Sequence, residues 1–187
     1  MSLKRCGTVF EPSSNTRNVS SYLNALDTGH HWEETSLTYY FVTTTDTSTS
    51  DGYDLTNWTD TQKDNYRVAI QAWDDVSAFT LTEAEDAYET ADIKLFLIND
   101  SSYGYLGHAY FPDGTATQGQ NYVSLNNATD TDFTVGSYDY ITMVHEFGHT
   151  LGLAHPHDNG GSSTQFPGVS NWYNLGTNNQ NQTVNTV

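Results

Sequence analysis

The feature that most constrains this chain is a group of three histidines at fixed spacing. His145 and His149 lie four residues apart, and His155 lies three residues beyond Gly152. Residues four apart lie one above the other on the same face of a helix. His145 and His149 can therefore each present a ring nitrogen to one ion about 2.0–2.1 Å away. The spacing predicts a helix that carries two zinc ligands.

A third ligand requires that this helix end. One helix face cannot complete a tetrahedral ligand set, and Gly152 can take the left-handed conformation that turns the chain. His155 is then predicted to return to the metal. Three protein ligands with one open position are typical of a catalytic zinc site, whereas a structural site usually closes with a fourth ligand. Glu146 is offset round the helix, so we expect it beside the metal's water and not on the metal.

The alternative is an accidental histidine pair on a solvated helix. Against this reading, Ser137 is a suitable N-cap and Asp139 lies in the first turn, where a negative charge is favourable. Apolar residues also recur at helical spacing and predict a buried stripe. They are Tyr140, Val144, Phe147 and Leu151. We therefore predict a packed helix over about 138–152.

The remaining periodicity predicts an α+β domain. A Thr59-x-x-Gln62 capping box precedes a long amphipathic helix over 60–77, and a short helix is predicted over 18–27. The predicted strands are Leu37–Val42, Phe79–Glu83, Ile93–Ile98 and Tyr122–Leu125. The range 44–57 is predicted to be a loop, and little regular structure is expected after His155. The expected architecture is a twisted mixed sheet packed on two long helices, with the zinc site at its edge.

Charge and hydropathy exclude some classes of protein. The 187 residues include 6 basic and 23 acidic ones, a net charge of -17, which disfavours binding to nucleic acid. There is no apolar run of about 18 residues or more, so no membrane span is predicted, and no N-terminal signal peptide is recognisable. An acidic surface suits Ca²⁺, although solvated turn carboxylates are the alternative. The loop carboxylates concerned are Asp46, Asp51, Asp54 and Asp158.

The run His145–Pro156, read as H-E-x-x-H-x-x-G-x-x-H-P, resembles the serralysin branch of the metzincin zinc proteases. Three other stretches are similar to the same family, and the resemblance covers roughly residues 20–187. These stretches are Ser36–Phe41, Ala69–Val76 and Gly104–Pro112. The resemblance implies a metzincin fold: a five-stranded sheet, a long backing helix and an active-site helix. Residues 1–17 would be an irregular lead-in, and residues 18–187 the catalytic domain.

The same resemblance implies a secreted, extracellular zinc endopeptidase that acts on protein or peptide substrates. It would hold one catalytic zinc and hydrolyse peptide bonds through a zinc-activated water, with Glu146 as general base. Gly107–Phe111 would be the cleft-side edge strand, to which a substrate backbone adds. The candidate substrate-binding residues are Gly107, His108, Ala109 and Tyr110. An ordinary edge strand is the alternative, with His108 a surface histidine; His157 is expected to lie outside the ligand set.

The sequence also departs from the family pattern. Serralysins have a Met-containing turn beneath the zinc, but here no Met follows the zinc motif, since Met143 precedes His145. We therefore expect a catalytic domain that lacks the Met-turn and the C-terminal helix. Two alternatives stay open: a zinc-binding but non-catalytic module, and an acidic calcium-binding adhesion domain. The lone cysteine, Cys6, follows Arg5 as in the Arg-Cys-Gly core of matrixin pro-segments, so it is either a latency thiol or an ordinary free thiol.

Overall fold

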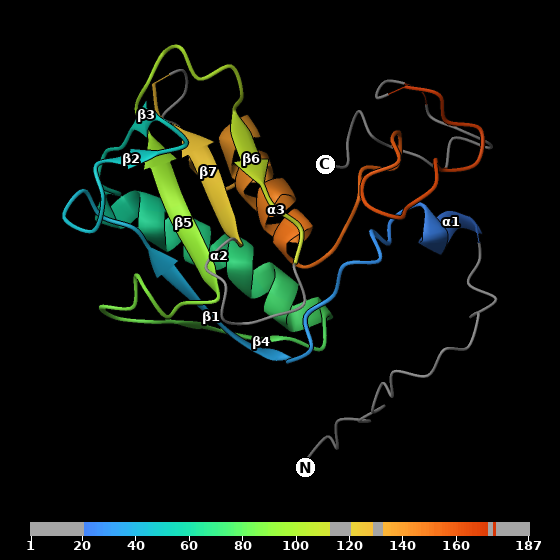
Figure 1. Ribbon diagram of the computed structural model, residues 1–187, viewed down its shortest axis with the longest axis horizontal. Helices are drawn as coiled ribbons and strands as arrows, with labels where there is room; N and C mark the ends of the chain where they lie inside the picture. Colours follow the sequence, from blue (N-terminus) through green and yellow to red (C-terminus); the bar gives the residue numbers. More distant parts are fainter. Residues whose placement is uncertain (1–20, 113–120, 129–132, 172–173, 175–187) are drawn as a thin grey trace.

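The computed structural model describes residues 21–112, 121–128, 133–171 and 174. The predictions for Cys6 and for the lead-in over 1–17 lie outside the described residues. The elements are α1 (Ser21–Asn24), β1 (Ser36–Phe41), β2 (Thr49–Ser50), β3 (Tyr53–Asp54), α2 (Asp60–Val76), β4 (Thr80–Glu83), β5 (Ile93–Ile98), β6 (Gly107–Ala109), β7 (Tyr122–Asn126) and α3 (Tyr138–Thr150) (Figure 1). This is the α+β composition predicted from the sequence.

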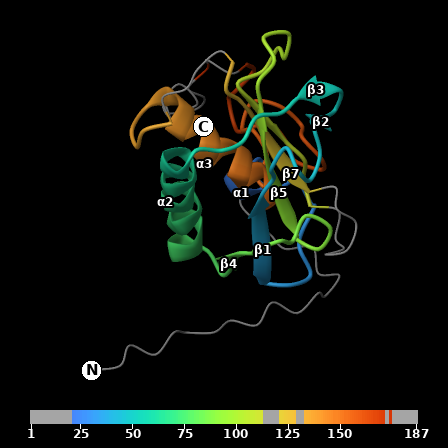
Figure 2. The same ribbon diagram turned by 90° about the vertical axis from the view of Figure 1, so that its left-hand side faces the viewer.

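Five of the strands form one mixed sheet in the order β4-β1-β5-β7-β6. The pairs β4/β1, β1/β5 and β5/β7 are parallel, whereas β6 runs antiparallel to β7. Figure 2 shows the two long helices, α2 and α3, on the same face of this sheet. The strand β6 ends the sheet on the side of α3 (Figure 1).

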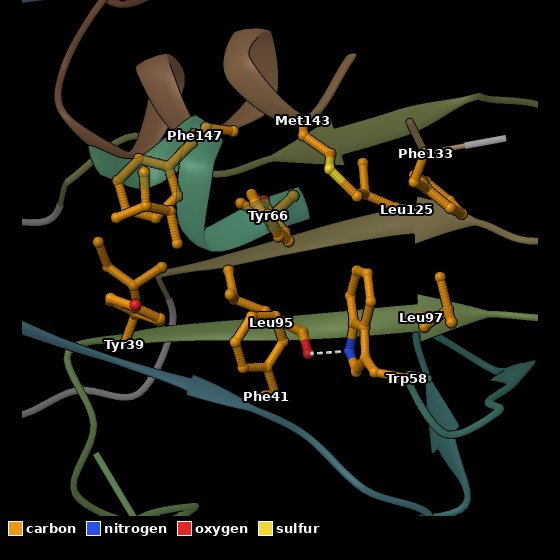
Figure 3. Close-up of a cluster of buried hydrophobic side chains, with 14 of the residues drawn as sticks. Tyr39, Phe41, Trp58, Tyr66, Leu95, Leu97, Leu125, Phe133, Met143 and Phe147 are labelled. Atoms are coloured by element: carbon orange, nitrogen blue, oxygen red, sulfur yellow. Dashed lines mark hydrogen bonds between the residues drawn. The ribbon is translucent and has the colours of Figure 1, made fainter. Parts of the chain in front are cut away.

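The core lies between the sheet and the two helices (Figure 3). Met143 and Phe147 of α3 and Tyr66 of α2 are completely buried there. The indole N–H of Trp58 donates to the carbonyl of Leu95 in β5, 3.0 Å away, so this ring's polar atom is satisfied inside the core. Because Met143 and Phe147 are four residues apart, they set which face of α3 meets the sheet.

Local sequence explains how the helices begin and how closely they pack. The predicted capping box is present at α2, with reciprocal bonds between Thr59 and Gln62. Gly148 allows α3 to approach α2, because a Cβ at this position would lie 2.9 Å from Cζ2 of Trp73. The indole N–H of Trp73 donates to the carbonyl of Val144, 3.0 Å away. These contacts hold α3 against the backing helix.

Two local predictions need correction. The range 44–57 is not only loop, because β2 and β3 form a small antiparallel hairpin within it. Asp51 and Gly52 connect these strands with φ of 52° and 85°, as in a two-residue type I′ turn, and the Asp-Gly pair is the local sequence signal for this hairpin. The helix expected over 18–27 ends at Asn24, after which the chain is extended or turning. Among the described residues, no helix is both long and apolar enough to cross a membrane.

Candidate zinc centre

Helix α3 carries His145, Glu146 and His149. Its first turn is capped as predicted, since the amide of Tyr140 donates to Ser137 Oγ at 3.1 Å. Met143 and Phe147 face the sheet, and a residue two positions further along a helix lies about 200° round the axis. His145 and His149 are two positions beyond these core residues, so they lie on the side of α3 that faces away from the sheet.

The helix ends where the sequence predicted, and the end returns the chain toward the histidines. Gly152 has a φ of 97°, and its amide donates to the carbonyl of His149 at 3.0 Å. The amide of Leu153 donates back to the carbonyl of Gly148 at 3.1 Å, which closes the last turn. His155, two residues further along, then faces the rings on α3.

The three predicted ligands meet at their Nε2 atoms. His145 Nε2 lies 2.9 Å from His155 Nε2 and 2.9 Å from His149 Nε2, and the remaining pair is 3.0 Å apart. These separations are slightly shorter than the approximately 3.3 Å expected between two ligands on a tetrahedral zinc ion. A small outward movement of the rings would bring the three nitrogens to the spacing that the ion requires.

Two of the rings are oriented by acceptors on their other nitrogen. Nδ1 of His149 lies 2.7 Å from the carbonyl oxygen of Leu153, and Nδ1 of His155 lies 2.8 Å from Asp158 Oδ2. These oxygens accept hydrogen bonds, so each Nδ1 carries the proton and each Nε2 presents a lone pair. Burial lowers the pKa of His149 to about 4, which keeps its ring neutral at pH 7. Two lone pairs facing each other at 3.0 Å repel, and a cation between them removes the repulsion, so the donor set fits zinc.

Asp158 takes a role that the sequence analysis did not assign. The sequence predicts it only as a loop carboxylate for Ca²⁺. Burial on its own would raise the pKa of Asp158, but hydrogen bonds from His155 and from the amide of Gly160 lower it, so the carboxylate is ionised. A carboxylate three residues after the third histidine was the available signal, because metal-bound histidines commonly donate to such a group.

His157 lies beside the cluster and outside it. Its ring stacks on that of His155, with centroids 4.9 Å apart and planes 16° apart, and its Nε2 is 4.0 Å from Asp158 Oδ2.

Two groups of described side chains have the spacing to hold a metal ion, and they share His155. They are His145, His149 and His155, and His155, His157 and Asp158. Neither group contains the other calcium candidates, of which Asp46 and Asp51 accept hydrogen bonds from Tyr40 and Tyr122.

Glu146 is 7% exposed and lies directly against the edge strand β6. A Cβ placed on Gly107 would lie 2.6 Å from Glu146 Cγ, so the absence of a side chain at Gly107 makes room for this carboxyl. Burial raises the pKa of Glu146 to about 8. A cation held by the neighbouring histidines would stabilise the carboxylate and bring that pKa down again.

Three of the four candidate substrate residues form β6, which is shorter than the predicted strand over 107–111, and Tyr110 directly follows it. Their side chains divide between two faces. Side chains alternate along a strand, so Gly107 and Ala109 face α3, and His108 and Tyr110 face the opposite side. The His108 ring packs edge-on against Tyr110, with centroids 4.9 Å apart. Just beyond the strand, Phe111 packs edge-on against His149 at 5.7 Å. The structure therefore places only part of the predicted set next to Glu146.

Comparison with known proteins agrees with this fold and this cluster. The peptidase M10 matrixin family model matches residues 31–170, which is most of the chain. The chain therefore belongs to the matrixin family of metallopeptidases.

Within that class, the predicted resemblance to serralysins is confirmed. Serralysin of Photorhabdus laumondii is 34% identical over 112 residues, which are 59% of this chain and 23% of that protein. Metallopeptidase AprA of Pseudomonas marginalis is 34% identical over 130 residues, covering 65% of this chain and 27% of that protein. Metalloprotease AprA of Pseudomonas entomophila is 31% identical over 164 residues, covering 79% of this chain and 32% of that protein.

The chain thus spans less than a third of the length of each of these relatives. Among solved structures, myroilysin is 17% identical, with a TM-score of 0.48 over 71% of this chain and 55% of that chain.

Proposed function

We propose that this chain hydrolyses peptide bonds as a zinc-dependent endopeptidase acting on protein or peptide substrates. The observation that carries the proposal is the meeting of three histidine Nε2 atoms, all within 3.0 Å of one another. Two of these histidines lie on the helix that also carries the buried Glu146, and the third, His155, lies in the loop that follows it. The similarity to serralysin and to two metallopeptidases supports it.

In this proposal His145, His149 and His155 would hold one zinc ion. When bound, the ion would lower the pKa of a water molecule and polarise the scissile carbonyl. Glu146 acts as the general base: it accepts a proton from the attacking water and later delivers it to the departing amine. Its buried position suits this work, because a desolvated carboxyl holds a proton more readily than an exposed one.

The edge strand would bind the substrate backbone. The amide of Tyr110 donates to Tyr122 and the amide of Asn126 donates to Leu106, so alternate residues of this segment bond to β7. By the antiparallel pattern, Gly107 and Ala109 then direct their N–H and C=O groups to the free edge. An extended peptide can add there as a further strand. Because Gly107 has no side chain, a peptide paired with it would lie close to Glu146.

The test is cleavage of a quenched peptide by the zinc-loaded chain, beside Glu146→Gln and a matched Glu85→Gln control on an exposed glutamate. We expect Glu146→Gln to retain one zinc per chain and to lose about 10²–10⁴-fold in turnover, with the control unchanged. Retained turnover in Glu146→Gln would remove the proposed role of Glu146. Zinc binding without cleavage by the parent chain would favour the non-catalytic module.

The extracellular location and the assignment of 18–187 as the catalytic domain stay predictions of the serralysin resemblance.

A further inference from the structure

Residues 24–30, here called the strut, run between two parts of the loop that carries His155. In Figure 1 this segment runs on from the last residue of α1 and lies beside the chain that leaves α3. The contacts on one side of the strut are an antiparallel bridge between Asp27 and Leu153, a bond from the Ala154 amide to the Leu26 carbonyl (2.9 Å) and a bond from the Thr28 amide to the Gly152 carbonyl (3.2 Å). The start of the loop is therefore attached to the strut.

The end of the same loop is attached to the other side of the strut. The amide of Ser162 donates to the carbonyl of Thr28 at 2.6 Å, and the amide of Thr164 donates to the carbonyl of Asn24 at 3.3 Å. The loop over 152–164 is thus held at both of its ends by one short segment that lies more than 120 residues earlier in the chain.

Thr28 lies at the centre of this arrangement and is completely buried. Its hydroxyl donates to the carbonyl of Gly152 at 2.8 Å and accepts the amide of His30 at 3.2 Å. Gly161 packs closely against it, because a Cβ at Gly161 would lie 2.4 Å from the Thr28 carbonyl oxygen. Gly161 also has a φ of 61°, so glycine is favoured there for two reasons. The close packing leaves little freedom for the loop to shift relative to Thr28.

The strut also contacts the residue that orients a histidine on α3. The carbonyl of Leu153, the residue that bridges to Asp27, is the acceptor for Nδ1 of His149 at 2.7 Å. The strut therefore fixes both the acceptor that orients His149 and the two ends of the loop that carries His155.

We propose that the strut is a positioning element of the zinc centre and that the Thr28 hydroxyl is its central contact. This inference rests on the proposed role of the histidines as zinc ligands. It predicts that order in residues 24–30 and zinc affinity are coupled, and such coupling acts equally in both directions.

One test replaces the Thr28 hydroxyl by a methyl group of similar size in Thr28→Val. Zinc affinity is measured by competition with a chelator of known affinity. We expect affinity to fall by about 10–100-fold, the usual effect of losing a group that orients a ligand, and Thr28→Ser to restore it. The matched control is Thr38→Val in β1, where the lost hydroxyl bonds to Asp92 at 2.7 Å, far along the chain from the histidines. The control should lower stability without changing zinc affinity.

A second measurement needs no variant. Amide hydrogen exchange of the parent chain, with and without zinc, should show slower exchange of the Thr28 and Ser162 amides when zinc is bound. The positioning role would be overturned, and the proposed function kept, by the following result: the parent chain binds zinc, Thr28→Val binds it with the same affinity, and zinc does not change the exchange of these amides. A parent chain that binds no zinc would instead overturn the proposed function, and the positioning role with it.

Discussion

The imidazole rings of His149 and His155 are each oriented by an oxygen atom outside the cluster. For His149 the acceptor is a backbone carbonyl, which no substitution of Leu153 removes. For His155 it is the Asp158 side chain, 2.8 Å away, which can be changed directly. Asp158 therefore offers a residue-scale test of whether the Nδ1 acceptor controls zinc binding.

We expect Asp158→Ala to weaken zinc binding by about 10–100-fold, because the His155 ring then loses the acceptor that fixes its tautomer and orientation. Asp158→Asn keeps an acceptor oxygen but removes the charge, so its affinity should lie between those of the alanine variant and the parent. Chelator competition measures all three. Equal losses in the two variants would mean that the negative charge matters and the hydrogen bond does not.

At the scale of elements, the turn that ends α3 depends on Gly152 for two separate reasons. Its φ of 97° is unfavourable for other residues, and a Cβ would lie 2.5 Å from the backbone carbonyl oxygen of His30. Gly136, just before α3, has a similar φ of 91° but open space around the Cβ position. Alanine substitutions at Gly136 and Gly152 therefore separate the cost of backbone strain from the cost of a steric clash.

We predict that Gly136→Ala lowers the free energy of unfolding by about 1–3 kcal/mol through strain alone. Gly152→Ala should cost at least about 1 kcal/mol more, because a backbone carbonyl has to move. Urea unfolding in the presence of a chelator gives both values without a contribution from metal. Equal costs for the two variants would show that the turn shifts freely away from His30.

For the whole molecule, the proposed zinc site links metal to global stability. A ligand that binds only the folded state adds RT ln(1 + [L]/Kd), which is about 2.7 kcal/mol at a hundred times Kd. We expect removal of zinc by a chelator to lower the melting temperature, and His155→Ala to lose most of the zinc-dependent increment. Thermal unfolding with and without zinc measures this.

The control for that measurement follows from the net charge of -17, since any divalent cation relieves repulsion among the carboxylates. Magnesium at the same concentration should raise the melting temperature less than zinc does. An equal rise with both metals would point to charge screening and leave no role for a specific site.

Much of the fold was predictable because its signals are local. The Thr59 capping box, the Ser137 cap and the buried runs of β1 and β5 each lie within a few residues, so single-sequence periodicity finds them. The β2–β3 hairpin has an equally local signal in its Asp-Gly turn, but the surrounding Thr, Ser and Asp residues favour a loop. Which residues of β6 face α3 was not predicted, because that depends on how the helix packs against this strand.

By itself, the sequence determined the identity and spacing of the three histidines, the offset of Glu146 and the stop at Gly152. These features follow from helical periodicity and from the conformational freedom of glycine, both of which act over a few residues. Only the tertiary structure decided what surrounds them: the strut through Thr28, the acceptor for His149 and the approach of Gly107 to Glu146. The contacts of Thr28 with Gly152 and of Gly107 with Glu146 join residues that are distant along the chain, and the contact of His149 with Leu153 depends on the turn that ends α3. These contacts therefore form only when the whole domain packs.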